Sequence, residues 1–175
     1  MEEKIIIAGA GGQGIMLLGK VLAAAAVKEN KHVTWLPCYG AEVRGGAAYC
    51  MVIISDAEIS SPYIKKADTL LVMNAPSLAG FKNRLVSKGL MLINSSLARD
   101  RVKVDARVAR FPFSEIASEV VGNIKTANIV ALGCLLSHKK IVRPDSVNKV
   151  IKEMAPKKEL AVINLRALEE GMHLR

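Results

Sequence analysis

Glycines near the amino end of the chain have a spacing that could hold an anionic ligand. Gly9, Gly11 and Gly14 match the pattern G-x-G-x-x-G, with a further glycine at Gly12 and an amide side chain at Gln13. Glycine lets the backbone turn sharply and leaves no side chain between the peptide N–H groups and a ligand. The start of a helix adds unpaired N–H donors and the positive end of the helix dipole. The pattern therefore favours phosphate or nucleotide binding, and the alternative is that the glycines only let a helix pack closely on a strand.

The residues around these glycines predict the elements that would position them. Residues 5–8 are a short apolar run, typical of a buried strand. Apolar residues recur at helical spacing after the last glycine, namely Ile15, Leu18, Leu22 and Ala26. A strand, a glycine turn and a helix in this order are the context in which the motif indicates a binding site.

A second glycine-rich loop follows the predicted second strand. It contains one acid and one base between glycines, and its candidate binding residues are Tyr39, Gly40, Glu42, Arg44, Gly45 and Gly46. Loops of this kind carry function when a rigid sheet positions them, and an exposed Arg can grip a carboxylate or phosphate with two hydrogen bonds. The alternative is that Glu42 and Arg44 are ordinary solvated loop charges.

The usual nicotinamide-binding fold needs an Asp or Glu about 20 residues beyond the glycines to hold the ribose hydroxyls. Here the second strand is followed by Pro37 and Cys38, and no acid is present at its end. Arg44 comes too late to accept a 2′-phosphate at that position. The sequence therefore argues against a dehydrogenase, although a stand-alone nucleotide-binding oxidoreductase stays as the alternative function.

Catalytic and metal-binding patterns are sparse. The cysteines Cys38, Cys50 and Cys134 lie far apart, whereas zinc and iron–sulfur sites need several closely spaced thiolates. The chain shows no nucleophile elbow, P-loop lysine or H-E-x-x-H pattern. We therefore expect no metal or cluster on this chain, no catalytic residue, and no reaction run by the chain alone.

Composition limits the partners. The 175 residues carry 25 Lys and Arg against 16 Asp and Glu, a net charge of +9. The basic residues are scattered, and with 4% aromatics there is little to stack on bases, so a nucleic-acid-binding domain is the weaker hypothesis. No apolar run approaches the ~20 residues needed to cross a membrane. We expect a cytoplasmic protein with a solvated or partner-facing basic surface.

The remaining pattern predicts one α/β domain over residues 1–175, a three-layer α/β/α Rossmann-like sandwich with a mostly parallel sheet. Residues 32–36 are expected to complete a βαβ unit with the first strand. Residues 47–54 are expected to turn back at 55–57 and form an antiparallel hairpin with 58–59. Further strands are predicted at 69–73, 90–94 and 106–111. Helices are predicted from Asn74 to about Gly89, and at 115–121, 126–136, 143–154 and 157–171. Asn74 and Thr126 are expected to cap the helices that they begin. On the last helix the residues expected to face inward are Leu160, Ile163, Ala167 and Leu168.

Taken together, the two glycine-rich motifs resemble a known family. The segments Gly9-Ala-Gly-Gly-Gln-Gly14 and Tyr39-Gly-Ala-Glu-Val-Arg-Gly-Gly46 are similar to the gamma subunit of 2-oxoacid:ferredoxin oxidoreductases, which also occurs as an internal domain of single-chain pyruvate:ferredoxin oxidoreductases. The resemblance covers nearly the whole chain, including Asn128 at the start of an apolar helix. Ala41 departs from it, since many relatives have proline there. The loop is most similar to that of the pyruvate, 2-oxoglutarate and branched-chain 2-oxoacid enzymes.

The resemblance implies a complex whose other subunits carry the reacting cofactors. Alpha and beta subunits, and a ferredoxin-like delta subunit in some complexes, would bind thiamine diphosphate and iron–sulfur clusters. The complex would decarboxylate a 2-oxoacid oxidatively, form an acyl-CoA and reduce ferredoxin. This chain would place its two loops at a subunit interface near the active site, where they help to place coenzyme A or close the substrate channel. The choice of 2-oxoacid would lie on the partner chains.

Overall fold

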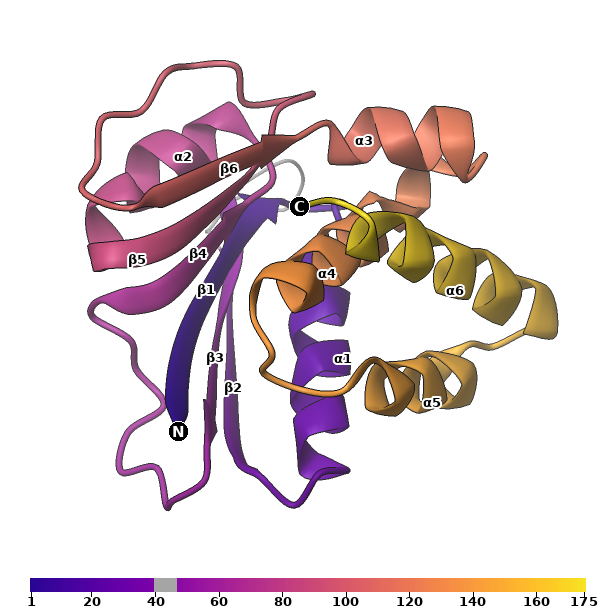
Figure 1. The fold of residues 1–175 in the computed structure, drawn as a ribbon, viewed down its shortest axis with the longest axis horizontal. Helices are drawn as coiled ribbons and strands as arrows, with labels where there is room; N and C mark the ends of the chain where they lie inside the picture. Colours follow the sequence, from indigo (N-terminus) through magenta and orange to yellow (C-terminus); the bar gives the residue numbers. More distant parts are fainter. Residues whose placement is uncertain (40–46) are drawn as a thin grey trace.

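The computed structural model describes residues 1–39 and 47–175, which form a six-stranded mixed sheet with helices on both faces (Figure 1). The order of strands across the sheet is β2-β3-β1-β4-β5-β6. Strand β3 is antiparallel to both of its neighbours, and the strands from β1 to β6 on the other side are parallel. The strand bounds are β1 Glu2–Ala10, β2 His32–Tyr39, β3 Ala47–Ser55, β4 Ala67–Val72, β5 Leu85–Asn94 and β6 Arg107–Phe111.

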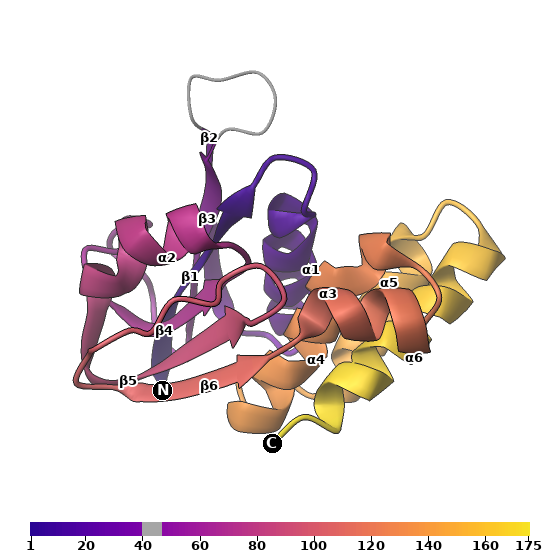
Figure 2. The same ribbon diagram turned by 90° about the horizontal axis from the view of Figure 1, so that it is seen from above.

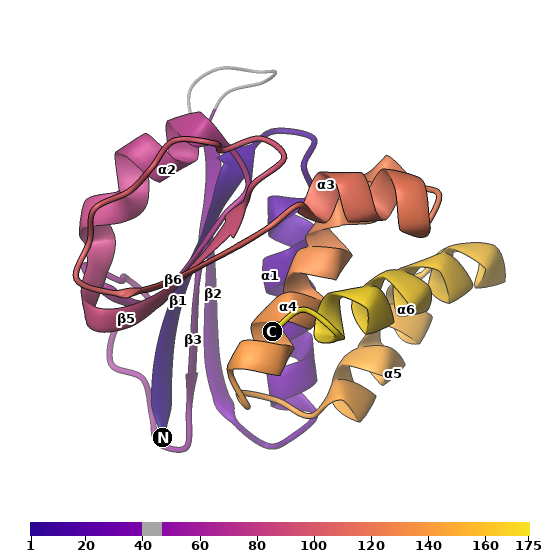
Figure 3. The same ribbon diagram turned by 45° about the horizontal axis from the view of Figure 1, so that its top comes forward.

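The helices are distributed unequally between the two faces. Helix α2 covers one face, and α1 and α4 cover the other, with α5 and α6 packed outside them (Figures 1 and 3). Short helical turns η1 (Lys82–Arg84), η2 (Ile116–Val120) and η3 (Ile124–Thr126) complete the described part. The helix bounds are α1 Ile15–Val27, α2 Ala75–Phe81, α3 Phe113–Glu115, α4 Ala127–His138, α5 Pro144–Met154 and α6 Lys158–Met172.

The core consists of two apolar layers separated by the sheet. Alternate residues of a strand point to opposite faces, so Ile5 and Ile7 of β1 face α1 and α4, whereas Ile6 and Ala8 face α2. Helix α4 is buried around nearly its whole circumference, as its apolar sequence predicts. The three-layer α/β/α architecture with a mostly parallel sheet is thus confirmed.

The predicted pairing of the second and third strands is wrong. Strand β2 runs in the same direction as β1, but β3 lies between them, so the two do not form an adjacent βαβ pair. The antiparallel hairpin exists, but its partner strand is β2 rather than residues 58–59, which form no strand. Instead Ile59 and Ile64 pack on the α2 face of the sheet and cover apolar strand residues there.

The helix after β4 is shorter than predicted. Asn74 caps it as expected, since its side chain accepts a hydrogen bond of 3.0 Å from the Ser77 backbone N–H. The helix ends at Phe81 rather than near Gly89, and β5 begins at Leu85. Gly89 lies inside β5, where a Cβ would come within 2.9 Å of the Asp68 carbonyl oxygen. Close approach of two strands, rather than the end of a helix, therefore requires this glycine.

Two predicted details near the carboxyl end also need correction. Thr126 precedes α4 as expected, but its hydroxyl donates to the Asn123 carbonyl at 2.7 Å and caps no N–H of that helix. Leu160 was predicted to face inward on the last helix, yet it is 40% exposed, whereas Ala167 and Leu168 are buried. Leu160 instead lines a hollow with apolar residues of α1, α4 and α5.

The strand order places a topological switch point between β1 and β4. From β1 the chain passes through α1 on one face of the sheet to β2, and from β4 it passes through α2 on the other face to β5. Looking at that end of the sheet, Figure 2 shows the turn after β1 and the start of α2 on either side of this point. In open α/β sheets, ligands bind beyond the carboxyl ends of the strands at such a point.

Candidate functional site

The glycine turn occupies the switch point, between the end of β1 and the start of α1. Gly12 and Gly14 both have positive φ, +91° and +72°, conformations that only glycine adopts without strain. A Cβ on Gly12 would meet nothing within 4 Å, so this peptide faces open space. Gly11 and Gly12 are exposed. The turn therefore presents bare backbone at the amino end of a 13-residue helix.

Gln13 ties the turn to the neighbouring strand. Its side-chain oxygen accepts from the Ala10 N–H at 2.7 Å and from the Asn74 amide at 3.3 Å. Its side-chain nitrogen lies 3.4 Å from the Met73 carbonyl oxygen. A Cβ on Gly9 would come within 2.7 Å of the Gln13 oxygen. Gly9 thus makes room for the side chain that holds the turn, which is the packing role proposed as the alternative for that glycine.

Asn128 supports the turn from below. It is 2% exposed, and its amide nitrogen donates to the Gly14 carbonyl at 3.0 Å. A Cβ on Gly14 would lie within 2.8 Å of the Asn128 Cγ atom, so the two residues fit only while position 14 is glycine. The Asn128 side-chain oxygen is buried and has no partner among the described residues. Asn128 is therefore placed to hold the turn, and it does not line open space.

Sequence reasoning missed an amide network along the same edge. Asn94, fully buried at the end of β5, donates to the Met73 carbonyl at 3.2 Å and to the Ser114 hydroxyl at 2.9 Å. Together with Gln13 and Asn74, these groups join β1, β4, β5 and α3. The available signal was a polar residue directly after a buried apolar run, which marks the end of a strand at the edge where sites form.

A cavity of about 320 Å³ opens beside the turn. Lys125, in η3 directly before α4, is the charged residue that borders it, and the helix N–H groups and dipole at the start of α4 also favour an anion. The lining is otherwise mainly apolar and consists of Gly12, Gln13, Met73, Leu97, Ser114, Ile124, Lys125 and Ala127. Two of the predicted site residues, Gly12 and Gln13, therefore line a cavity.

The second predicted loop lies largely outside the described residues. Gly40, Glu42, Arg44, Gly45 and Gly46 fall in residues 40–46, so their placement stays a prediction. The two residues that bracket the loop are described. Ala47 pairs with Ala10, and Tyr39, 73% exposed, pairs with Ala48. The loop therefore leaves and re-enters the sheet at the same edge as the glycine turn.

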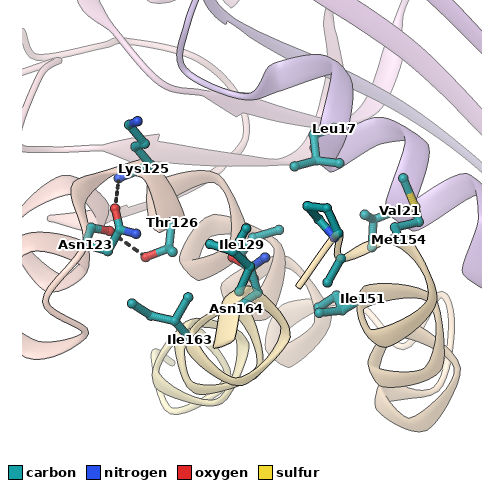
Figure 4. A pocket seen from close by; sticks show the side chains of 13 residues that line it. Leu17, Val21, Asn123, Lys125, Thr126, Ile129, Ile151, Met154, Ile163 and Asn164 are labelled. Atoms are coloured by element: carbon teal, nitrogen blue, oxygen red, sulfur yellow. Dashed lines mark hydrogen bonds between the residues drawn. The ribbon is translucent and has the colours of Figure 1, made fainter. Parts of the chain in front are cut away.

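A second hollow of about 230 Å³ lies on the other side of the α4 start. Figure 4 shows aliphatic side chains from α1, α4, α5 and α6 around it, with Asn123 accepting from the Lys125 N–H at 3.0 Å. Lys125 borders both cavities. The hollow contains no Asp, Glu, His or Cys among its described lining residues, so it offers space and an apolar surface rather than acid–base chemistry.

Thiols near the site differ in reactivity. Burial raises the pKa of the Cys50 thiol to about 12, and burial raises that of Cys134 to about 12 as well. A neutral buried thiol is a poor nucleophile. Cys38 is only partly buried, and its hydrogen bond with Tyr49 is the main cause of a raised Tyr49 pKa.

Two further properties of the described residues concern metals and membranes. No group of three or more His, Cys, Asp or Glu side chains within residues 1–39 and 47–175 could hold a metal ion. In the same ranges, no helix is both long and apolar enough to cross a bilayer.

The geometry argues further against a dinucleotide site of the usual kind. In that fold the strand beside β1 brings an acid to the ribose. Here the strand beside β1 is the antiparallel β3, which begins at this edge with Ala47 rather than ending there with an acid. The fold thus defines a Rossmann-like α/β protein, with exposed backbone at the glycine turn and a cavity beside it that Lys125 borders.

Comparison with known proteins identifies the family. Residues 4–174 match the model of the pyruvate ferredoxin/flavodoxin oxidoreductase family, and the chain belongs to that family. It is 37% identical over 160 residues to the 2-oxoglutarate synthase subunit KorC of Methanocaldococcus jannaschii, covering 90% of this chain and 86% of that subunit. It is 36% identical over 172 residues to the ketoisovalerate oxidoreductase subunit VorA of Methanothermobacter thermautotrophicus, covering 97% of this chain. The chain spans only 36% of the VorA length.

A solved structure supports the same assignment. The gamma subunit of a keto/oxoacid ferredoxin oxidoreductase from Geobacter sulfurreducens PCA superimposes with a TM-score of 0.87 at 29% identity, covering 98% of this chain and 96% of that one. The family resemblance carried by the two glycine motifs is therefore confirmed.

Proposed function

We propose that this chain is the gamma subunit of a thiamine-diphosphate-dependent 2-oxoacid:ferredoxin oxidoreductase. The complex would oxidatively decarboxylate a 2-oxoacid, form an acyl-CoA and reduce ferredoxin. The observation that carries the proposal is the similarity to KorC, because this chain spans 86% of that subunit at 37% identity. The family match over residues 4–174 supports it along the whole fold.

The glycine turn (residues 9–14) and the cavity beside it, together called the glycine edge, would be this chain's contribution to the active site. Coenzyme A carries several phosphates, and such anions suit bare backbone N–H groups at a helix start together with a lysine. The open space beside Gly12 and the neighbouring Lys125 fit this group. We assign Gly11 and Gly12 to contact with the ligand, and Gly9, Gln13, Gly14 and Asn128 to holding the turn in shape. Tyr39 and the loop residues Gly40, Glu42, Arg44, Gly45 and Gly46 would close over the same edge.

The reacting cofactors would lie on other chains. Thiamine diphosphate and iron–sulfur clusters would be held by alpha and beta subunits, and by a ferredoxin-like delta subunit where one is present. This chain's residues would bind and orient coenzyme A and exclude water at the interface. Residues 1–175 would act as one gamma-type domain, and the complex would be cytoplasmic.

Affinity purification of the tagged chain from its own cells, followed by mass spectrometry, tests assembly. The expected result is stoichiometric recovery of at least two partner chains, one of them carrying thiamine diphosphate. Recovery of the chain as a lone monomer would refute the assignment. Tight NAD or FAD binding by that monomer would instead support the alternative, a stand-alone nucleotide-binding oxidoreductase.

Kinetics of the complex test the role of the glycine edge. Gly12→Asp would place a negative charge in the open space beside the turn, and we expect a KM for coenzyme A raised by about tenfold or more. Gly12→Asn has nearly the same shape and a similar tolerance of positive φ without the charge, and it is the matched control. The KM for the 2-oxoacid should stay unchanged in both variants. An equal effect of both variants on coenzyme A would show that strain, rather than anion binding, explains the loss.

A further inference from the structure

A groove at the other end of the molecule has no role in the function proposed above. It runs between α5 and α6 and continues toward the link between α4 and α5, beside the amino end of β1. Figures 1 and 3 show α5 and α6 side by side, away from the glycine turn. The two stretches of the groove have volumes of about 700 and 740 Å³, and both are bordered by Pro144, Met172 and Arg175.

The floor of the groove between α5 and α6 is apolar. Val162 is 67% exposed there, although a side chain of this kind is normally covered. Leu165 and Met172 are half-buried beside it, and Leu168 is buried beneath them. The same helices bury apolar residues on their inner faces, so Val162 is not needed for their packing. Val162 together with the half-buried Leu165 and Met172 gives the groove an apolar floor that is rimmed by polar residues, as in a surface that receives apolar side chains of a partner.

The walls of the groove are basic. Its lining includes two acids, Glu29 and Glu169, against Lys31, Lys140, Arg143, Lys152, Arg166 and Arg175. Lys31 is paired with Asp56. Within the described residues, no acidic partner lies within ion-pair distance of Lys140, Lys152, Arg166 or Arg175. The groove therefore contributes to the net charge of +9.

One of the two acids is already engaged. The Glu29 side chain is 10% exposed, and its carboxylate accepts from the Arg143 backbone N–H at 2.7 Å. Its oxygen also lies 3.6 Å from the Arg143 guanidinium, which itself is 77% exposed. Glu29 thus fixes the α4–α5 link while the positive group points to solvent. Among the described residues that line the groove, Glu169 is the one exposed acid that remains.

We propose that this groove docks an acidic amphipathic segment of another polypeptide chain. Its apolar side chains would cover Val162 and Leu165, and its carboxylates would face Lys140 and Lys152, whereas the Arg166 guanidinium is engaged with the Val120 carbonyl oxygen at 2.7 Å. A second copy of this chain fits poorly, because two basic grooves repel each other. A nucleic acid fits poorly as well, because the described lining residues include no Phe, Tyr or Trp on which bases could stack. The proposal goes beyond the gamma-subunit function, since the groove lies apart from the glycine edge.

Photo-crosslinking in the native assembly tests the occupant. A benzophenone amino acid replaces Val162, which is exposed enough to tolerate it, and Lys65 on the α2 face is the control position. The expected product joins position 162 to one segment of another chain that has apolar residues at helical spacing and an excess of Asp and Glu. No product above the control would overturn the proposal. So would a product with nucleic acid, with a second copy of this chain, or with a neutral or basic segment.

Binding of the identified segment as a peptide tests the charges. The full-length chain with Lys140→Glu and Lys152→Glu together should bind the peptide about tenfold or more weakly than wild type. Lys65→Glu with Lys66→Glu makes the same change in net charge on the other face and should leave affinity unchanged. Circular dichroism confirms that both proteins are folded. Equal affinities for the two double variants would overturn the electrostatic part of the proposal. This result would not depend on where coenzyme A binds.

Discussion

The fit between Gly14 and Asn128 makes a quantitative prediction about the glycine turn. Gly14→Ala places a Cβ within 2.8 Å of the Asn128 Cγ atom, at a φ of +72°. The positive φ costs about 1–2 kcal/mol for a residue with a Cβ. Displacing Asn128 also breaks its 3.0 Å hydrogen bond to the Gly14 carbonyl and leaves buried polar groups unpaired, which costs about 1–3 kcal/mol more. The expected loss in the free energy of unfolding is about 2–5 kcal/mol.

Gly12→Ala separates the cost of backbone strain at positive φ from the cost of displacing Asn128. Position 12 has a φ of +91° and nothing within 4 Å of a Cβ, so only the strain of about 1–2 kcal/mol applies. Gly80→Ala is a second control, because its Cβ also meets nothing within 4 Å and its φ is not positive. Alanine in that helix should stabilise the protein by about 1 kcal/mol. Urea unfolding followed by circular dichroism measures all three.

A double-mutant cycle checks that Asn128 is the obstacle. In an Asn128→Ala background, Gly14→Ala should cost only the strain, so the two changes should be coupled by about 1–3 kcal/mol. Additive effects, or equal losses for Gly14→Ala and Gly12→Ala, would refute the assignment of Asn128 as the support of the turn.

The remaining predictions concern other parts of the fold. Gly171→Ala should lower the free energy of unfolding by about 3 kcal/mol or more, because its Cβ would overlap the Val130 carbonyl where α6 crosses α4. Thermal unfolding measures this loss, and a change below about 1 kcal/mol would contradict the close crossing. Iodoacetamide at pH 8 should label Cys38 and spare Cys50, because burial raises the pKa of the Cys50 thiol to about 12. Mass spectrometry of the labelled peptides tests this, and rapid labelling of Cys50 would contradict its burial. The pKa of Asp56 falls from 3.8 to about 2, mainly through its hydrogen bond from Lys31, so it stabilises the fold above pH 4 and this contribution is lost as the pH falls through 2. Acid unfolding of Asp56→Asn should therefore be less steep between pH 4 and 2, and an unchanged curve would show that the pair contributes nothing.

The sequence predicted the local features well, because they depend on neighbouring residues. The strand before the glycines, the Asn74 cap and the apolar α4 follow from residue types and spacing. The pairing of β3 could not be obtained this way. Its apolar run fits any buried position, and insertion beside β1 is decided by pairs of residues that lie between 37 (Ala10 and Ala47) and 53 (Glu2 and Ser55) positions apart. Local turn residues suggested 58–59 as its partner, but the tertiary packing favoured β2.

In the candidate site, too, the sequence predicted the local features, and the long-range contacts required the structure. The glycine spacing identified the turn, and the missing acid at the end of β2 argued against the usual dinucleotide site before any geometry was known. The roles of individual residues required the fold. Asn128 comes 114 positions after Gly14, and only the packing of α4 under the turn shows that it is a support. The role of Asn94 could not be predicted for the same reason, since the strand order brings it to the Met73 carbonyl.

Reconstitution of the complex from separate subunits tests the central claim most directly. The measured quantity is the reduction of ferredoxin that depends on both a 2-oxoacid and coenzyme A. We predict that the partner subunits without this chain show little of this activity, and that adding the chain at a one-to-one ratio restores it. Full activity of the partner subunits without this chain would contradict its assignment as the gamma subunit.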